Sequence, residues 1–341
     1  MSVQTDHYTA ITREFILPGL VDNFFYNHPL LDMLWKKRDT ITHGRLIDWR
    51  FSMSGNQSLQ TYSAFAQFLA RPVEFAKQAS LPWCHMVMPV ELSIIENAMN
   101  GKGTAEGDLK LVRESLKNAK LGFNDRLSQD IHGDGSAFAH PYWAAKVENP
   151  IVGLQKILST GRTYARWNSS TYAVLDPYVI EIAAGTDYGD IQTEGNQYYL
   201  PHLIEEGMNE TDYGDGKIDI LVGSIIMAQA YKQAIQGKET RVIIDGGVGN
   251  TAKFGVNSAE YRNTEVISDR DMPGGALYGL NSEKIGLKVL AGFDMTFNDF
   301  EETNMRDTIV ANFKLSAQLV ATEPRSLFAI TGGPTNRNIA G

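Results

Sequence analysis

The sequence predicts an α+β protein shaped as a long, narrow slab, with one very long helix lying on a narrow antiparallel sheet. Two observations predict it. Near the C-terminus, apolar residues occupy every second position of segment 309–321, which is the period of a strand with one buried face. In segment 104–131, apolar residues recur every three or four positions, which places them on one stripe of a helix.

The two segments also agree in length. A strand over 309–321 spans roughly 43 Å at about 3.3 Å per residue, more than twice the usual strand length. A helix over 104–131 spans roughly 42 Å at about 1.5 Å per residue. We therefore expect them to lie side by side, with the odd-numbered strand residues under the helix. Such a slab has long sheet edges and much surface for its core, so we expect it to need partners.

The N-terminal part predicts an arm followed by a short helix. Residues 1–21 carry little periodic signal and are interpreted as an extended arm. Residues 22–37 predict a helix capped by Asp22 and interrupted at Pro29. The apolar residues expected to turn inward are Phe25, Leu30, Leu31 and Leu34.

A two-stranded excursion is predicted from residue 44 onward. Apolar residues alternate over 47–53, and a return strand is predicted over 83–90. The connection, residues 54–82, carries several aromatic residues. Because a lone hairpin is marginally stable in water, the excursion packs either on its own domain or across a neighbouring subunit.

The remainder predicts a mixed α/β region and a short closing strand. A turn entering a helix is expected over 149–159, a second helix over 199–208, and a strand followed by a helix over 218–236. A short strand over 241–245 with a turn over 246–250, and a second turn over 271–275, come next. Residues 327–330 predict the closing strand.

Composition indicates a folded chain of two or three domains, with 341 residues of which 43% are hydrophobic. No apolar run is long enough for a membrane span or a signal peptide, so we expect cytosolic synthesis and no membrane association. Cys84 is the single cysteine, which excludes an intrachain disulfide and a cysteine-based zinc site. We expect Cys84 to be a buried apolar residue.

The negative charge is concentrated in one acidic block. The net charge of −9 argues against a surface that grips phosphates. Residues 167–216 contain ten acidic residues and no Lys or Arg, so the block carries −10 and the remainder of the chain +1. The block predicts a metal site, a negatively charged pore lining or a solvated insertion, and these alternatives stay open.

Motifs for catalysis or cofactor binding are incomplete. The turn at Gly246 is not followed by the helix that a dinucleotide site needs. His132, Asp134 and Ser136 lie close in sequence but lack a nucleophile-elbow motif, and the histidines lack the spacing of paired metal ligands on one helix. We therefore predict no catalytic residue, no cofactor and no metal ligand. A structural or assembly protein is favoured over an enzyme.

The order of elements resembles the major capsid protein of tailed bacteriophages, the Hong Kong 97 fold. Four passages carry the resemblance: the excursion 44–90, similar to that family's E-loop; 104–131, similar to its spine helix; the middle of the chain, similar to its axial domain; and the C-terminal passage 304–332, in which a long alternating strand leads to Pro324 and a short apolar strand.

The resemblance implies an N-terminal arm and lead helix (1–43), an E-loop (44–92), a peripheral domain (93–150 and 281–323) and an axial domain (151–280 and 324–341). It implies a non-enzymatic coat protein that self-assembles into pentamers and hexamers of an icosahedral head around double-stranded DNA. The implied partners are other copies of the chain, a separate scaffolding protein, a portal, decoration proteins and DNA contacted without sequence specificity. Its implied location is the virion capsid, assembled in the host cytoplasm.

Two family features are not expected here. The excursion contains one lysine, Lys77, without a crosslinking motif, and the arm before the excursion has no room for a fused scaffolding segment. Two alternatives to a phage coat are an encapsulin-type shell, and a cytosolic hydrolase or binding protein using the acidic block. Aromatic residues often anchor interfaces, so the predicted contacts with neighbouring subunits are Trp49, Phe51, Phe65 and Phe68.

The two faces of the long strand receive different predicted roles. The even-numbered residues are expected to face solvent, DNA or the next subunit. Replacing Phe313 or Leu315 by Asp is expected to abolish folding, whereas changes at Lys314 or Gln318 are expected to alter assembly at most.

Overall fold

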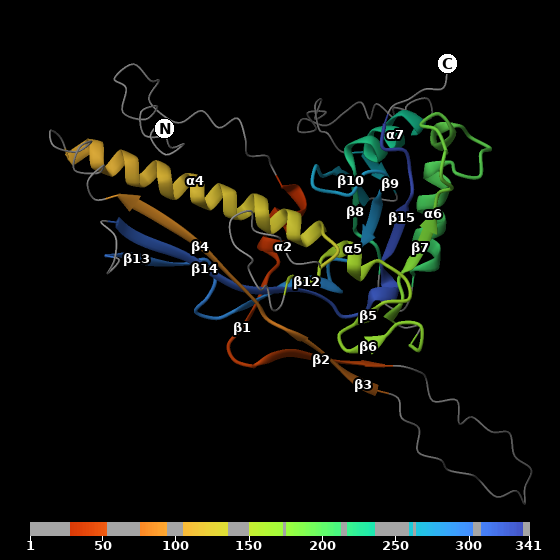
Figure 1. Cartoon of the computed structure of the whole chain (residues 1–341). Coiled ribbons are helices and arrows are strands. Elements are labelled where there is room, and N and C mark those ends of the chain that lie inside the picture. Colours follow the sequence, from red (N-terminus) through yellow and green to blue (C-terminus); the bar gives the residue numbers. More distant parts are fainter. Residues whose placement is uncertain are drawn as a thin grey trace, which may run out of the picture.

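The computed structural model describes residues 28–52, 76–93, 105–135, 150–172, 175–212, 217–235, 259–261, 264–302 and 308–336. These residues form an elongated part and a more compact part side by side (Figure 1). Each part is built on its own sheet. No helix in the described part of the chain is long and apolar enough to cross a lipid bilayer.

The elongated part contains a five-stranded sheet centred on β14 (Thr308–Ala321). Along one edge, β14 pairs antiparallel with β13 (Thr296–Glu302) and then with β12 (Ile285–Leu290). Along its other edge lies β4 (Cys84–Ser93), also antiparallel, and β1 (Asp39–Ile41) adds to β12 in parallel. The predicted long strand is confirmed, and it is the central member of this sheet.

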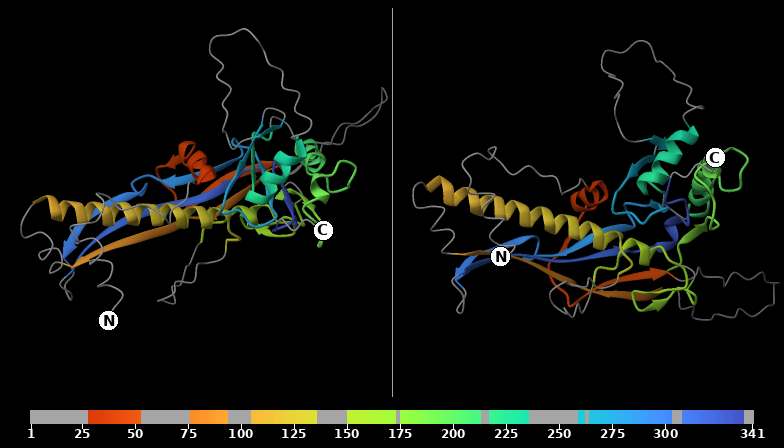
Figure 2. Two further views of the ribbon diagram at one scale, coloured as in Figure 1. Left: turned by 90° about the horizontal axis from the view of Figure 1, so that it is seen from above. Right: turned by 45° about the horizontal axis from the view of Figure 1, so that its top comes forward.

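One long helix, α4 (Ala105–His132), runs lengthwise over this sheet, as both views of Figure 2 show. Its buried residues Phe123, Leu127 and Ile131 belong to the same hydrophobic core as Leu315 and Leu319 of β14. The predicted helix over 104–131 and its position along the long strand are therefore confirmed.

The lead helix, α2 (Pro29–Lys36), begins where an interruption was predicted. Pro29 occupies the first turn, where a missing backbone N–H costs no intrahelical hydrogen bond, and His28 before it is not helical. Leu30, Leu31 and Leu34 are buried as predicted. Residues 22–27 lie outside the described residues.

The excursion differs from its predicted pairing. Strand β2 (Leu46–Ser52) pairs antiparallel with β3 (Ala76–Pro82), a segment expected to be part of the connection. The predicted return strand is instead β4, which joins the sheet of β14. The segment of β3 alternates weakly in hydrophobicity, and its buried residues Ala79, Ser80 and Leu81 are consecutive. The chain between β2 and β3, including Phe65 and Phe68, lies outside the described residues.

The compact part contains a six-stranded sheet in the order β7 (Tyr178–Glu181), β15 (Phe328–Thr331), β11 (Leu277–Leu280), β8 (Ile220–Gly223), β10 (Thr264–Ser268) and β9 (Ala259–Tyr261). Helices α6 (Leu200–Glu210) and α7 (Ile225–Ile235) cover one face. Alternate residues of β8 and β11, such as Val222 and Tyr278, belong to the core shared with α4. This sheet is therefore buried on both faces and joins the two parts.

Short elements complete the described chain: α5 (Leu154–Ile157), β5 (Thr163–Tyr164), β6 (Trp167–Asn168), and the 3₁₀ turns Asp190–Gln192 and Pro324–Ser326. The predicted helix at 199–208, the strand and helix at 218–236 and the closing strand at 327–330 are confirmed. Of the helix predicted at 149–159, one turn forms. The strand predicted at 241–245 and the turn at 246–250 lie outside the described residues.

The expected division of β14 into a buried and an exposed face holds only in part. Leu315, Ala317 and Leu319 are buried as predicted, but Ser316 and Gln318 are also buried. The pairing with β4 ends at Ala317, and segment 150–152 lies beside the strand beyond that point. There the side chain of Gln318, which is 0% exposed, accepts a hydrogen bond from Val152 N. The expectation that Gln318 faces solvent or a partner is therefore wrong.

Candidate functional site

One candidate contact surface is the outer face of the sheet formed by β4 and β14. Val87 is 60% exposed and lies opposite Lys314 in the antiparallel register. Because residues directly opposite one another project to the same side of a sheet, both side chains belong to this outer face. The next pair on the same face, His85 and Ser316, is joined by a hydrogen bond of 2.7 Å between Nδ1 and Oγ.

A second candidate surface lies at strand β13. The ring of Phe297 is 37% exposed, and its centroid lies 5.1 Å from that of Phe313 on β14. Phe293, just before the strand, is also exposed. Within the described residues, β13 pairs with β14.

The predicted contact residues Trp49 and Phe51 pack within the chain itself. Phe51 is 7% exposed, and its ring lies 6.2 Å from Trp167 and 6.5 Å from Tyr172 between centroids. Trp49 is half-buried, 6.0 Å from Tyr164. Within this chain, Trp49 and Phe51 therefore pack on their own domain, which is the first of the two alternatives given for the excursion. A contact of Trp49 or Phe51 with another subunit remains a prediction.

The acidic block occupies the α6 side of the compact part. Tyr178 donates a hydrogen bond of 2.7 Å to Glu206, and this bond, with burial, raises the pKa of Tyr178 to about 12. Just ahead of the acids, burial lowers the pKa of Arg162 to about 10, although Asp176 at 3.8 Å opposes that shift. Among the described residues, no acid of the block belongs to a cluster of three potential metal ligands. The three alternatives for the block therefore stay open.

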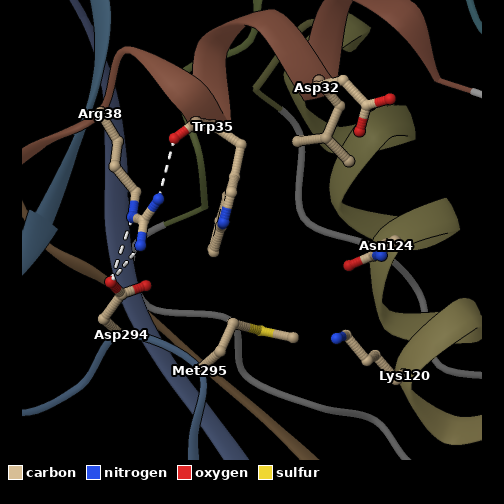
Figure 3. Close-up of a pocket in the computed structure, with 8 residues that line it drawn as sticks. Asp32, Trp35, Arg38, Lys120, Asn124, Asp294 and Met295 are labelled. Carbon is tan, nitrogen blue, oxygen red and sulfur yellow. Dashed lines mark hydrogen bonds and ion pairs between the residues drawn. The ribbon is translucent and has the colours of Figure 1, made fainter. Parts of the chain in front are cut away.

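A pocket of about 330 Å³ opens between α2, α4 and the turn that follows β12 (Figure 3). The Arg38 guanidinium donates hydrogen bonds of 2.9 and 3.1 Å to Asp294 Oδ2 and one of 3.0 Å to Trp35 O. These bonds hold the Arg38 guanidinium against Asp294 and the Trp35 carbonyl. The other lining residues are Leu31, Asp32, Lys120, Asn124 and Met295, and no nucleophile with an adjacent base is among those eight residues.

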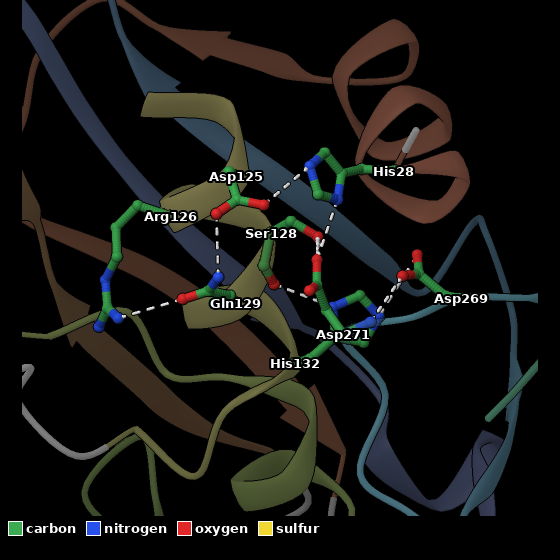
Figure 4. Close-up of polar contacts among 8 residues, drawn as sticks. All are labelled: His28, Asp125, Arg126, Ser128, Gln129, His132, Asp269 and Asp271. Carbon is green, nitrogen blue, oxygen red and sulfur yellow. Dashed lines mark hydrogen bonds and ion pairs between the residues drawn. The ribbon is translucent and has the colours of Figure 1, made fainter. Parts of the chain in front are cut away.

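A buried polar cluster joins α2, α4 and the segment between β10 and β11 (Figure 4). His28, directly before α2, places Nδ1 2.9 Å from Asp271 Oδ2 and Nε2 3.5 Å from Asp125 Oδ1. Ser128 of α4 donates a hydrogen bond of 2.6 Å to the same Asp271 oxygen. Sequence reasoning searched for pairs on one helix and missed this cluster, because its members are brought together only by the tertiary fold.

The whole chain resembles solved capsid structures. A capsid chain of cyanophage A-1(L) matches with a TM-score of 0.64 and 15% identity, covering 94% of this chain and 96% of that one. A chain from the capsid of Myoviridae phage XM1 matches with a TM-score of 0.58 and 8% identity, over 94% and 96% of the two chains. The chain has the fold of phage major capsid proteins.

A solved encapsulin structure is also similar to this chain. The SrpI encapsulin of Synechococcus elongatus PCC 7942 matches with a TM-score of 0.50 and 9% identity, over 93% of this chain and 94% of that one. No protein-family model matches the chain, and no curated protein sequence matches it. The likeness is therefore one of shape, recognised from the arrangement of elements.

Proposed function

We propose that this chain is the major capsid protein of a tailed bacteriophage, which assembles with copies of itself into the pentamers and hexamers of an icosahedral head enclosing double-stranded DNA. The observation that carries the proposal is the near-complete overlap with the cyanophage A-1(L) capsid chain in both directions. An elongated subunit suits a closed shell, because each subunit of such a shell needs interfaces on several sides. The role needs no catalytic centre.

The proposed domain boundaries follow the two sheets. The Hong Kong 97 arrangement assigns residues 1–43 to an arm and lead helix, 44–92 to an E-loop, 93–150 and 281–323 to a peripheral domain, and 151–280 and 324–341 to an axial domain. Long helix α4 and the β14 sheet support the peripheral assignment, and the six-stranded sheet with α6 and α7 supports the axial one. We assign Trp49, Phe51, Phe65 and Phe68 to contacts between subunits that form on assembly.

The proposed partners are a separate scaffolding protein, a portal, decoration proteins and packaged DNA, with assembly in the host cytoplasm. The net charge of −9 supports a container that does not hold DNA tightly. Purified chain failing to close into shells until a scaffolding protein is co-expressed would support a separate scaffold. Efficient assembly of the chain alone would contradict that part of the proposal.

Electron microscopy of the expressed full chain tests the shell itself. We expect closed particles or isolated pentamers and hexamers, with mass in size-exclusion chromatography far above that of one chain. A stable monomer or dimer under all assembly conditions would overturn the shell and favour a hydrolase or binding protein.

An encapsulin-type shell is the second candidate, favoured by the match to SrpI. The phage capsid chains match with higher TM-scores, 0.64 and 0.58 against 0.50. Particles of one small, uniform size that enclose a protein cargo and exclude DNA would establish the encapsulin reading. Heads of larger size that package DNA when the portal and packaging enzymes are present would establish the phage reading.

A further inference from the structure

We propose that two buried histidine–aspartate pairs, His28 with Asp271 and His132 with Asp269, each hold a proton and make the junction between the elongated and the compact part sensitive to pH. The histidines lie directly before α2 and in the last turn of α4, and both aspartates lie between β10 and β11. Figure 4 shows each histidine beside its aspartate where these segments meet. The proposal is independent of the capsid role.

Both ring nitrogens of His132 face hydrogen-bond acceptors. Nδ1 lies 2.9 Å from Ser128 O, and since a carbonyl oxygen only accepts, this nitrogen carries a hydrogen. Nε2 faces Asp269 Oδ2 at 3.7 Å, and within the described structure neither of these two buried atoms has a hydrogen-bond partner. A neutral ring would point a lone pair at the carboxylate, whereas a second ring hydrogen makes the two groups attract. The place of His132 in the last turn of α4 also favours a positive charge.

His28 is placed in the same way between two carboxylates. Its Nδ1 lies 2.9 Å from Asp271 Oδ2, and its Nε2 lies 3.5 Å from Asp125 Oδ1. A neutral imidazole carries one hydrogen, so one of its nitrogens would face a carboxylate with a lone pair. An imidazolium carries two hydrogens and suits both neighbours. Because His28 is buried, its charge acts on these carboxylates with little screening by salt.

Among the described residues, the carboxylates of this cluster form ion pairs with histidine alone. Asp125, Asp269 and Asp271 make no ion pair there with a lysine or an arginine. Asp269 is 1% exposed, and an isolated ionised carboxylate at such a place is costly. The two imidazoles are therefore the groups that can balance this negative charge, and each does so only while it holds a second ring hydrogen.

Other charged groups lie on the elements that pack at this junction. Arg126 pairs with Asp130 on α4, and burial raises the pKa of Asp130, although Arg126 opposes that shift. Arg270, between the two aspartates, is exposed. The remaining ones are Asp32 and Lys36 of α2 and Lys156 of α5. Of all these side chains, the histidines are the ones that ordinarily change charge between about pH 5 and 8.

The direction of the pH effect follows from where the protons are held more tightly. In the unfolded chain a histidine loses its proton near about pH 6.5. In the folded chain the facing carboxylates favour the protonated ring, so the proton is kept to higher pH. The stability that the pairs contribute is therefore complete below about pH 6.5 and is lost as the pH rises above that value.

Urea denaturation of the full, unassembled chain at about pH 6 and about pH 8.5 tests the proposal. We expect the equilibrium constant for unfolding of the wild-type chain to be roughly a hundredfold higher at the higher pH, about tenfold from each pair. Asp269→Asn is expected to remove about tenfold of that rise, because the amide donates to a neutral Nε2 of His132 and no proton is needed. Asp271→Asn is expected to do the same for the other pair.

The control is His202→Gln, which changes an exposed histidine of α6 and is expected to keep the full rise. Asp130 is present in every variant, so its own titration cancels from the comparison. An equal rise in wild type and Asp269→Asn, or a wild-type chain that gains stability toward higher pH, would overturn the proposal. Should the variants not fold, nitrogen-15 NMR of histidine-labelled wild-type chain decides. At about pH 6 both ring nitrogens of His28 and His132 are expected to carry hydrogen, and a bare Nε2 on His132 would overturn the proposal.

Discussion

The hydroxyl of Tyr164 holds both backbone groups of Ala321 at the end of the long strand. It accepts a hydrogen bond of 2.8 Å from Ala321 N and donates one of 3.1 Å to Ala321 O. Strand β4 no longer flanks β14 at this point, so a side chain replaces the missing backbone partner. Burial of the ring raises the pKa of Tyr164, which keeps the hydroxyl neutral and able to donate.

Replacing Tyr164 by Phe is expected to lower the free energy of unfolding by about 1–3 kcal/mol, because the N–H and C=O of Ala321 are buried and lose their partner. Urea denaturation of the unassembled chain, followed by circular dichroism, measures the loss. Tyr172→Phe is the control, since it keeps the ring contacts with Phe51 and Trp167. Equal losses in the two variants would contradict the role assigned to the Tyr164 hydroxyl.

The substitutions Leu315→Asp and Phe313→Asp are expected to have different effects. Leu315 is buried in the core under α4, whereas Phe313 is half-buried beside Phe297. A carboxylate at Leu315 has no partner and is expected to prevent folding, while Phe313→Asp is expected to fold with reduced stability. Soluble yield and circular dichroism of the two variants check this. Insoluble Phe313→Asp protein would show that this position belongs to the core after all.

That contrast shows what alternation in a sequence can and cannot predict. Period two identified the strand and its buried side correctly, because hydrophobic burial sets that pattern. It could not tell Phe313 from Leu315, since the depth of burial depends on what lies above each position. The alternation also wrongly placed Gln318 on the exposed face. This polar residue is buried against two segments that are distant in the sequence, which contain Pro82 and Val152.

Replacing Gln318 by Leu is expected to cost about 1–3 kcal/mol for each backbone group left without a partner. The side chain accepts a hydrogen bond of 2.8 Å from Val152 N and donates one of 3.0 Å to Pro82 O. Urea denaturation measures the effect. Lys314→Gln, on the outer face of the same strand, is the control and is expected to change stability by less than about 0.5 kcal/mol. Unchanged stability of Gln318→Leu would show that these bonds contribute nothing.

The buried polar cluster of His28, His132, Asp269 and Asp271 illustrates a different limit. His28 and His132 are 104 positions apart in the chain, and His132 and Asp269 are 137 positions apart. Rules based on spacing detect residues that share a helix or a loop, so they did not predict this cluster. Only the tertiary contact between α2, α4 and the β10–β11 segment brings these side chains together.

Cys84 is expected to resist modification in the native chain. Burial, and secondarily the nearby Asp130 carboxylate, raises its pKa from 9.0 to about 11, so the thiolate does not form near neutral pH. Because the folded pKa is the higher one, this group's contribution to stability is present below pH 9 and falls as the pH rises toward about 11. Thiol titration with and without denaturant checks the first point. Rapid reaction of native protein would contradict it.

Two glycines, Gly207 of α6 and Gly279 of β11, lie against the ring of Phe328. A Cβ atom at Gly279 would stand 2.1 Å from the ring, and one at Gly207 would stand 2.6 Å from it. Phe328 is fully buried, so the ring has no free space into which to move. Gly279→Ala is therefore expected to destabilise the chain by about 1–3 kcal/mol through overpacking.

A double substitution separates this overpacking from a simple loss of backbone freedom. Phe328→Leu removes ring atoms next to Gly279, so adding Gly279→Ala to it is expected to cost less than Gly279→Ala does alone, a non-additivity typical of residues in contact. Gly286→Ala on β12 is the control, because a Cβ there meets nothing within 4 Å. Thermal denaturation of the four variants measures the cycle. Strict additivity would show that Gly279 is needed for its backbone conformation and not for the space it leaves to Phe328.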